Sequence, residues 1–168
     1  MTGAEPWLRP IDELNRLPGA AFAEALRPLI ELAAPLASAL EDARPYGSYA
    51  ELLDRAQAEL ARLPEADQVT VLNAHPRIGD DPRRESALSA REQGSGSADV
   101  DRILAELNRA YEQRFGFRFV VFVNRRSRAE IVGVLRQRLA GPRESELPVG
   151  LREMLLIARD RLRRLQAS

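Results

Sequence analysis

Apolar residues recur at intervals of three and four along most of this chain, which is the spacing of one face of an α-helix. The clearest run follows Asp99 and ends at Gly116, a residue type that often terminates helices. Because a helix must bury its apolar face, this pattern favours a fold of helices packed on helices. The apolar positions of the run are Val100, Ile103, Leu104, Leu107, Tyr111 and Phe115.

The N-terminal quarter carries two further helical patterns. The stretch "PIDELNRL" opens with a proline and an acidic turn, as helices often do. Residues 19–40 are expected to form one or two helices, interrupted near Pro28 and Pro35 because proline cannot donate the backbone hydrogen bond of a helix interior.

Two helices are predicted before the only histidine. Ser48 is a suitable N-cap for a helix over 49–63. Pro64 ends that helix and begins a shorter one. The shorter helix should close at His75, because Pro76 disfavours helical geometry in the residue before it.

The C-terminal third predicts two more helices. The sequence "SRAE" at 127–130 is a capping-box pattern, and Gly141 with Pro142 should stop the helix that it begins. The last helix is expected to cover roughly 148–166.

Two segments depart from helical spacing. Residues 76–98 are polar and rich in glycine, proline and serine. Residues 117–124, "FRFVVFVN", are β-branched and aromatic like a strand, but they have no evident partner strand, so a buried apolar connector or a helical turn is favoured. The expected fold is therefore all-α, a compact helical bundle forming a single domain over residues 1–168.

Composition excludes several kinds of chemistry and partner. The chain has 25 basic and 25 acidic side chains, so its net charge favours neither nucleic acid nor a membrane surface. It has no lysine for a Schiff base and no cysteine for thiolate chemistry or a disulfide. No apolar stretch is long enough to cross a bilayer, and no secretory signal or peroxisomal address is evident, so cytoplasmic localisation is the default expectation.

His75 is the first candidate for chemistry. Imidazole exchanges protons near neutral pH without special tuning, and this one lies where an apolar helix turns into a polar loop. The alternative is a histidine that only caps helix carbonyls. A metal site is not expected, because one histidine and no cysteine leave only carboxylates as further ligands.

Ser89, Glu92 and Gln93 are the second candidate. On a helix Ser89 and Glu92 share a face, and hydroxyl, carboxylate and amide groups together suit a small polar heterocycle. The alternative is a plain capping box, which the spacing of Ser89 and Glu92 also fits.

Arg161 is the third candidate. A helical projection of the last helix places it inside an apolar band, between Met154 and Ile157. A guanidinium in such surroundings needs an anionic partner, which can be a protein carboxylate or a substrate carboxylate.

The order of these signals resembles a known family. "AHPRIG", "SAREQGSG", "LNRAYEQRFGFRFVVFV" and "SRAEIVGVLRQRL" follow one another as they do in the 2-oxo-4-hydroxy-4-carboxy-5-ureidoimidazoline (OHCU) decarboxylases of urate degradation. The similarity extends weakly towards both termini. Its specificity comes from the co-occurrence of His-Pro, Ser-x-x-Glu-Gln and Tyr-Glu-x-Arg-Phe-Gly-Phe at these separations.

The resemblance implies an all-α homodimer, a carboxy-lyase that forms (S)-allantoin from OHCU without metal or organic cofactor. It assigns catalysis to His75 and Glu92, and substrate contacts to a second set of residues. The late arginine of the family corresponds best to Arg161, with Arg159 as an alternative register. The substrate-contacting set is Pro76, Ser89, Gln93, Arg161 and the backbone of Phe119, Val120, Val121, Phe122 and Val123.

Two other functions remain open at this stage. The chain can be a helical module that binds a partner protein through an apolar surface and has no activity of its own. It can also be a relative of the family that acts on a different ureido or imidazolone acid.

Overall fold

The computed structural model describes residues 7–78 and 97–167, and within these ranges it is built from helices, with no strand. The all-α prediction is therefore confirmed. The helices are α1 (Ile11–Arg16), α2 (Gly19–Ala25), α3 (Ala34–Asp42), α4 (Tyr49–Arg62), α5 (Glu65–Asn73), α7 (Ser97–Phe115), α8 (Arg128–Leu139) and α9 (Arg143–Ala167).

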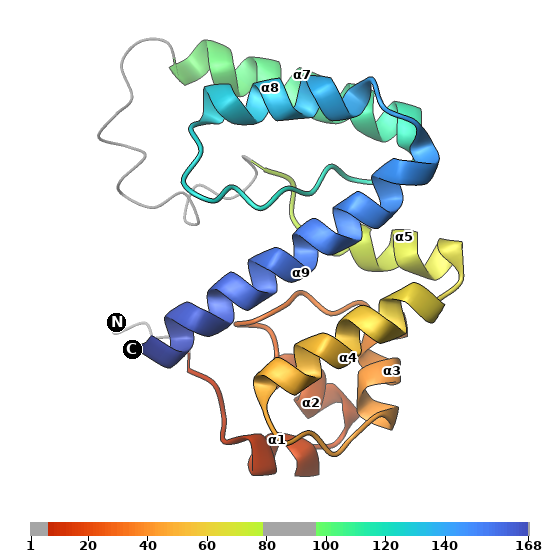
Figure 1. Ribbon diagram of the computed structural model, residues 1–168, viewed down its shortest axis with the longest axis vertical. Helices are drawn as coiled ribbons and strands as arrows, with labels where there is room; N and C mark the ends of the chain where they lie inside the picture. The colour runs from red at the N-terminus through yellow and green to blue at the C-terminus, as the bar shows by residue number, and fades with distance from the viewer. Residues whose placement is uncertain (1–6, 79–96, 168) are drawn as a thin grey trace.

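The long helix α9 organises the molecule (Figure 1). It crosses between two groups of helices, with α1 to α4 on one side and the paired helices α7 and α8 on the other. Helix α5 packs against α9, where Leu72 contacts Gly150. One apolar core runs through both groups, from Phe22 and Leu53 to Tyr111 and Leu135.

Most helix ends lie where their sequence signals predict. The Ser48 hydroxyl accepts a hydrogen bond from the Glu51 backbone N–H, and Ser127 and Glu130 form the complete capping box. Helix α7 ends at Gly116, whose φ of 81° is the left-handed conformation that glycine adopts without strain. Residues 19–40 form two helices, with Pro35 in the first turn of α3 rather than at a break.

The start of the last helix was predicted wrongly. Helix α9 begins at Arg143, and Pro148 lies inside it rather than at its first position. Tertiary contacts hold the extra turn: the Arg143 guanidinium donates to the Phe115 carbonyl and to Glu65, and the Glu146 side chain is buried. Smaller differences are that α5 closes at Asn73 and that α7 begins at Ser97.

Residues 117–124 form an irregular connector between α7 and α8 rather than a strand, as the preferred interpretation expects. The connector is buried at Phe117 and from Phe119 to Val121, but Val123 and Asn124 are exposed. The connector runs alongside α7 and α8 on the side that faces α9 (Figure 1). Among the described helices none is long and apolar enough to cross a membrane.

Candidate active site

His75 lies just beyond the end of α5 with its ring turned into the protein. Its backbone N–H donates to the Leu72 carbonyl at 3.1 Å, and the residue is 9% exposed. Nδ1 lies 3.1 Å from Oε2 of Glu31. This contact does not meet the geometry of a hydrogen bond, so it is an electrostatic contact between the imidazole and the carboxylate. The ring therefore faces a carboxylate rather than capping helix carbonyls.

The same carboxylate holds Arg161. Nη1 and Nη2 of Arg161 each lie 3.1 Å from one oxygen of Glu31, which is a bidentate ion pair. Nη1 also donates to the Leu29 carbonyl at 3.3 Å. The segment between α2 and α3 that carries Glu31 thus meets α9, and Figure 1 shows this segment passing close to that helix. The anionic partner predicted for Arg161 is a protein carboxylate.

Glu31 stays ionised despite its partial burial. Burial alone would raise the pKa of its carboxyl group, but the polar contacts and positive charge of His75 and Arg161 outweigh this and hold the pKa well below its usual range. The cluster of Glu31, His75 and Arg161 therefore contains a fixed negative charge between an imidazole and a guanidinium.

The connector 117–124 lies against the same part of the chain. The Arg118 backbone N–H donates to the Asn73 side-chain oxygen at 2.9 Å, and its guanidinium donates to the His75 carbonyl at 3.0 Å. These two bonds hold the start of the connector to the end of α5, next to His75.

Part of the connector backbone forms hydrogen bonds with side chains of other elements. The Val120 carbonyl accepts from Arg138 at 2.7 Å, and the Phe122 N–H donates to Glu153 of α9 at 2.7 Å. The backbone N–H groups of Phe119, Val120 and Val121 have no hydrogen-bond partner among the described residues. Because buried backbone donors are almost always paired, these three are suited to water or a ligand.

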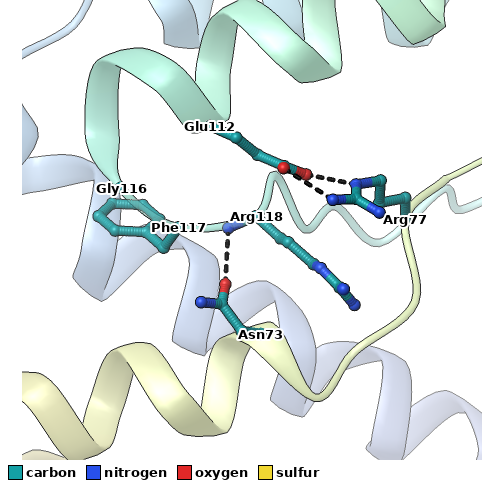
Figure 2. Close-up of a pocket in the computed structure, with 6 residues that line it drawn as sticks. All are labelled: Asn73, Arg77, Glu112, Gly116, Phe117 and Arg118. Atoms are coloured by element: carbon teal, nitrogen blue, oxygen red, sulfur yellow. Dashed lines mark hydrogen bonds and ion pairs between the residues drawn. The ribbon is translucent and has the colours of Figure 1, made fainter.

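A polar hollow of about 290 Å³ lies between the end of α5, the end of α7 and the start of the connector. Its lining residues are Asn73, Arg77, Glu112, Gly116, Phe117 and Arg118. Figure 2 shows Arg77 and Glu112 meeting across it, while Asn73 reaches the backbone nitrogen of Arg118. The Arg77 guanidinium binds Glu112 with two hydrogen bonds, of 2.6 and 2.9 Å, which lower the pKa of that carboxyl group. The hollow is therefore closed on one side by an ion pair that joins the residue after Pro76 to α7.

Arg159 faces a different part of the molecule. Its guanidinium donates to Asp54 at 2.8 Å and to Gln57 at 3.4 Å, on the surface of α4. These two residues line an open hollow of about 410 Å³, and no candidate residue in the described part of the chain lines it. Of the two registers left open for the late arginine, the structure brings Arg161 to His75.

The structure thus brings some predicted site residues together. His75, the half-buried Pro76 and Arg161 cluster at the junction of α5 and α9, and Phe119 to Val123 follow directly from the segment bound to Asn73 and His75. Ser89, Glu92 and Gln93 lie outside the described residues.

Sequence reasoning missed Glu31. A signal was present, because this lone carboxylate lies in the apolar run "PLIELAAPL", where an acidic side chain needs a positive partner. The run was interpreted only as helix interrupted by prolines. In the described part of the chain, no three His, Asp or Glu side chains gather in a way that could hold a metal ion.

Comparison with known proteins identifies the family to which this chain belongs. The family model described as OHCU decarboxylase matches residues 15–163. The chain is 30% identical over 158 residues to the 2-oxo-4-hydroxy-4-carboxy-5-ureidoimidazoline decarboxylase of Mus musculus, covering 89% of each. It is 25% identical over 156 residues to the uric acid degradation bifunctional protein of Bacillus sp. (strain TB-90), with 90% of this chain but only 31% of that protein covered.

Solved structures agree. A crystal structure of an OHCU decarboxylase in the presence of (S)-allantoin matches with a TM-score of 0.66 and 26% identity, covering 80% of this chain and 92% of the other.

Proposed function

Because this chain belongs to the OHCU decarboxylase family, we propose that it decarboxylates OHCU to (S)-allantoin in urate degradation. It would act as a carboxy-lyase with OHCU as its small-molecule substrate. The observation that carries the proposal is the cluster of His75, Glu31 and Arg161, which places the only imidazole beside a guanidinium at the end of α5. An imidazole that can exchange a proton and a guanidinium that can bind an anion suit a reaction on a small anionic acid.

The substrate supplies its own electron sink. When the bond to the carboxylate breaks and CO2 leaves, the electron pair moves into the adjacent imine of the ring, whose nitrogen takes up a proton, so no external cofactor is needed to accept the pair. The hydroxyl group then loses its proton and becomes a carbonyl, while a proton adds to the neighbouring ureido-bearing carbon. The protein must orient the acid, stabilise developing charge and deliver that proton to one face.

The proposal gives these tasks to named groups. His75 and Glu92 flank the reacting carbons. One sets the protonation state of the hydroxyl or carboxyl group, and the other donates the proton that determines the configuration of the stereocentre. Arg161 binds an anionic or carbonyl group. Pro76, Ser89 and Gln93 also contact the substrate. Residues 119–123 of the connector form hydrogen bonds with the ring and ureido amides of the substrate. The unpaired backbone N–H groups of Phe119 to Val121 support this role.

The direct test is to mix the purified chain with freshly generated OHCU, without added metal, and follow (S)-allantoin by circular dichroism. Acceleration over the spontaneous decay supports the decarboxylase. Binding without turnover supports a relative acting on another ureido or imidazolone acid, and inertness supports a non-catalytic interaction module. Both of the last two results contradict the proposal.

Glu92→Gln is the variant that separates catalysis from capping. The change keeps the size of the side chain but removes its charge, so turnover should fall by about 10²–10⁴-fold, the usual contribution of general acid–base help. The melting temperature should change little. Parallel losses of melting temperature and activity would instead assign Glu92 to a capping box.

The proposal also covers the assembly and location of the protein. We expect one domain over residues 1–168, a homodimer in solution and a cytoplasmic enzyme. Sedimentation of the purified chain tests the homodimer, and a monomer at micromolar concentration would contradict it.

A further inference from the structure

Among the described residues, Glu31 is the one side chain that contacts both the imidazole and the guanidinium of the candidate site. Its Oε2 lies 3.1 Å from His75 Nδ1 and from Arg161 Nη1, and its Oε1 lies 3.1 Å from Arg161 Nη2. It comes from the segment between α2 and α3, far in sequence from both partners. Its preceding neighbours Leu29 and Ile30 are fully buried, which fixes the backbone that carries it.

The contact with His75 determines which ring nitrogen carries the proton. A carboxylate beside Nδ1 stabilises the tautomer with the proton on Nδ1, because the N–H then points to a negative charge. The other nitrogen, Nε2, is left with a lone pair and has no hydrogen-bond partner among the described residues. A ring held this way presents a proton acceptor to the substrate.

The contact with Arg161 determines which edge of the guanidinium remains available. Glu31 occupies the end formed by Nη1 and Nη2, and the Leu29 carbonyl takes a further Nη1 proton. In the part of the chain that the structure describes, Nε and the second proton of Nη2 have no acceptor. These two donors form the side-on fork that binds a carboxylate with two parallel hydrogen bonds.

We propose that Glu31 is a positioning residue: its carboxylate holds the proton of His75 on Nδ1 and leaves the side-on edge of Arg161 for the carboxylate of the substrate. The effect of Glu31 on turnover rests on the proposed function. Its effects on the His75 tautomer and on the free edge of Arg161 do not. Glu31 acts through His75 and Arg161 and need not touch the substrate itself.

The lone histidine makes the proposal directly measurable, because long-range ¹H–¹⁵N spectra of the protein contain one imidazole. In its neutral form, the ring of the wild-type chain should show the Nδ1–H tautomer, and Glu31→Gln should lose that preference. Turnover of OHCU by Glu31→Gln should fall by about 10- to 100-fold in kcat, as for other residues that orient a catalytic imidazole, with a smaller change in KM. Glu31→Asp, which keeps the charge, should recover part of the rate.

Asp54→Asn is the matched control. It breaks the ion pair between Asp54 of α4 and Arg159 of α9. Like the pair of Glu31 and Arg161, this ion pair involves an arginine of α9, but it lies away from His75. It should leave both the tautomer and kcat unchanged.

The outcomes separate the two proposals. A wild-type Nε2–H tautomer overturns the positioning role, even if Glu31→Gln fails to fold. Glu31→Gln with the wild-type tautomer and the wild-type kcat overturns it too. A wild-type chain with the Nδ1–H tautomer that does not convert OHCU contradicts only the proposed function, and turnover with the Nε2–H tautomer contradicts only the positioning role.

Discussion

The residues of the candidate site differ in how clearly the sequence marks them. His75 could be singled out because it is the only histidine, and Arg161 because it interrupts an apolar band of α9. Their direct contact with Glu31 could not be predicted. Glu31 is separated from Arg161 by 130 residues in the chain, and the pairing depends on how the segment after α2 lies against α9.

The low pKa of Glu31 makes stability depend on pH. Its folded-state pKa lies below the usual 4.5, so its ionised form stabilises the fold fully above that value, and this contribution is lost as pH falls below it. The difference in free energy of unfolding between the wild-type chain and Glu31→Gln should therefore shrink between about pH 6 and about pH 3. Urea unfolding at several pH values measures it. A difference that stays constant over this range would show that the charge of Glu31 does not stabilise the fold.

Among the elements, the early start of α9 is explained by a buried polar network. Glu146 accepts hydrogen bonds from the Tyr111 hydroxyl at 2.8 Å and from Arg138 at 2.9 Å, and Arg138 also donates to the Val120 carbonyl. Burial and the neighbouring carboxylate raise the pKa of Tyr111, although Arg138 opposes this, so the phenol remains a donor. The network ties α7, α8 and α9 to the connector.

Sequence patterns could predict the helices but not this network. Capping residues and apolar spacing are local, so Ser48, Ser127 and Gly116 mark helix ends correctly. Pro148 is also a local signal, and it misleads because Arg138 and Tyr111 stabilise the preceding turn from other helices.

Glu146→Gln should destabilise the protein by about 3–5 kcal/mol, because it leaves the charge of Arg138 buried without its partner. Glu144→Gln is the control in the same turn of α9, where the side chain is exposed and the cost should stay below about 1 kcal/mol. Chemical unfolding of both variants gives the comparison. Equal costs would mean that the network does not hold the start of α9.

At the scale of the whole molecule, the site depends on how α5 and α9 pack. Gly150 of α9 faces Leu72 of α5 so closely that an added Cβ would lie 3.0 Å from the leucine side chain. This close approach brings the end of α5, and with it His75, towards the helix that carries Arg161. The all-α class could be predicted from periodicity, but such an interhelical fit depends on side-chain shapes across the core.

Conversion of OHCU by the wild-type protein and by His75→Asn, followed by circular dichroism, is the most direct measure of whether His75 is catalytic. If His75 manages a proton of the reaction, the folded variant should form (S)-allantoin about 10²–10⁴-fold more slowly than the wild-type protein. Formation of (S)-allantoin by His75→Asn at the wild-type rate would show that His75 is not catalytic.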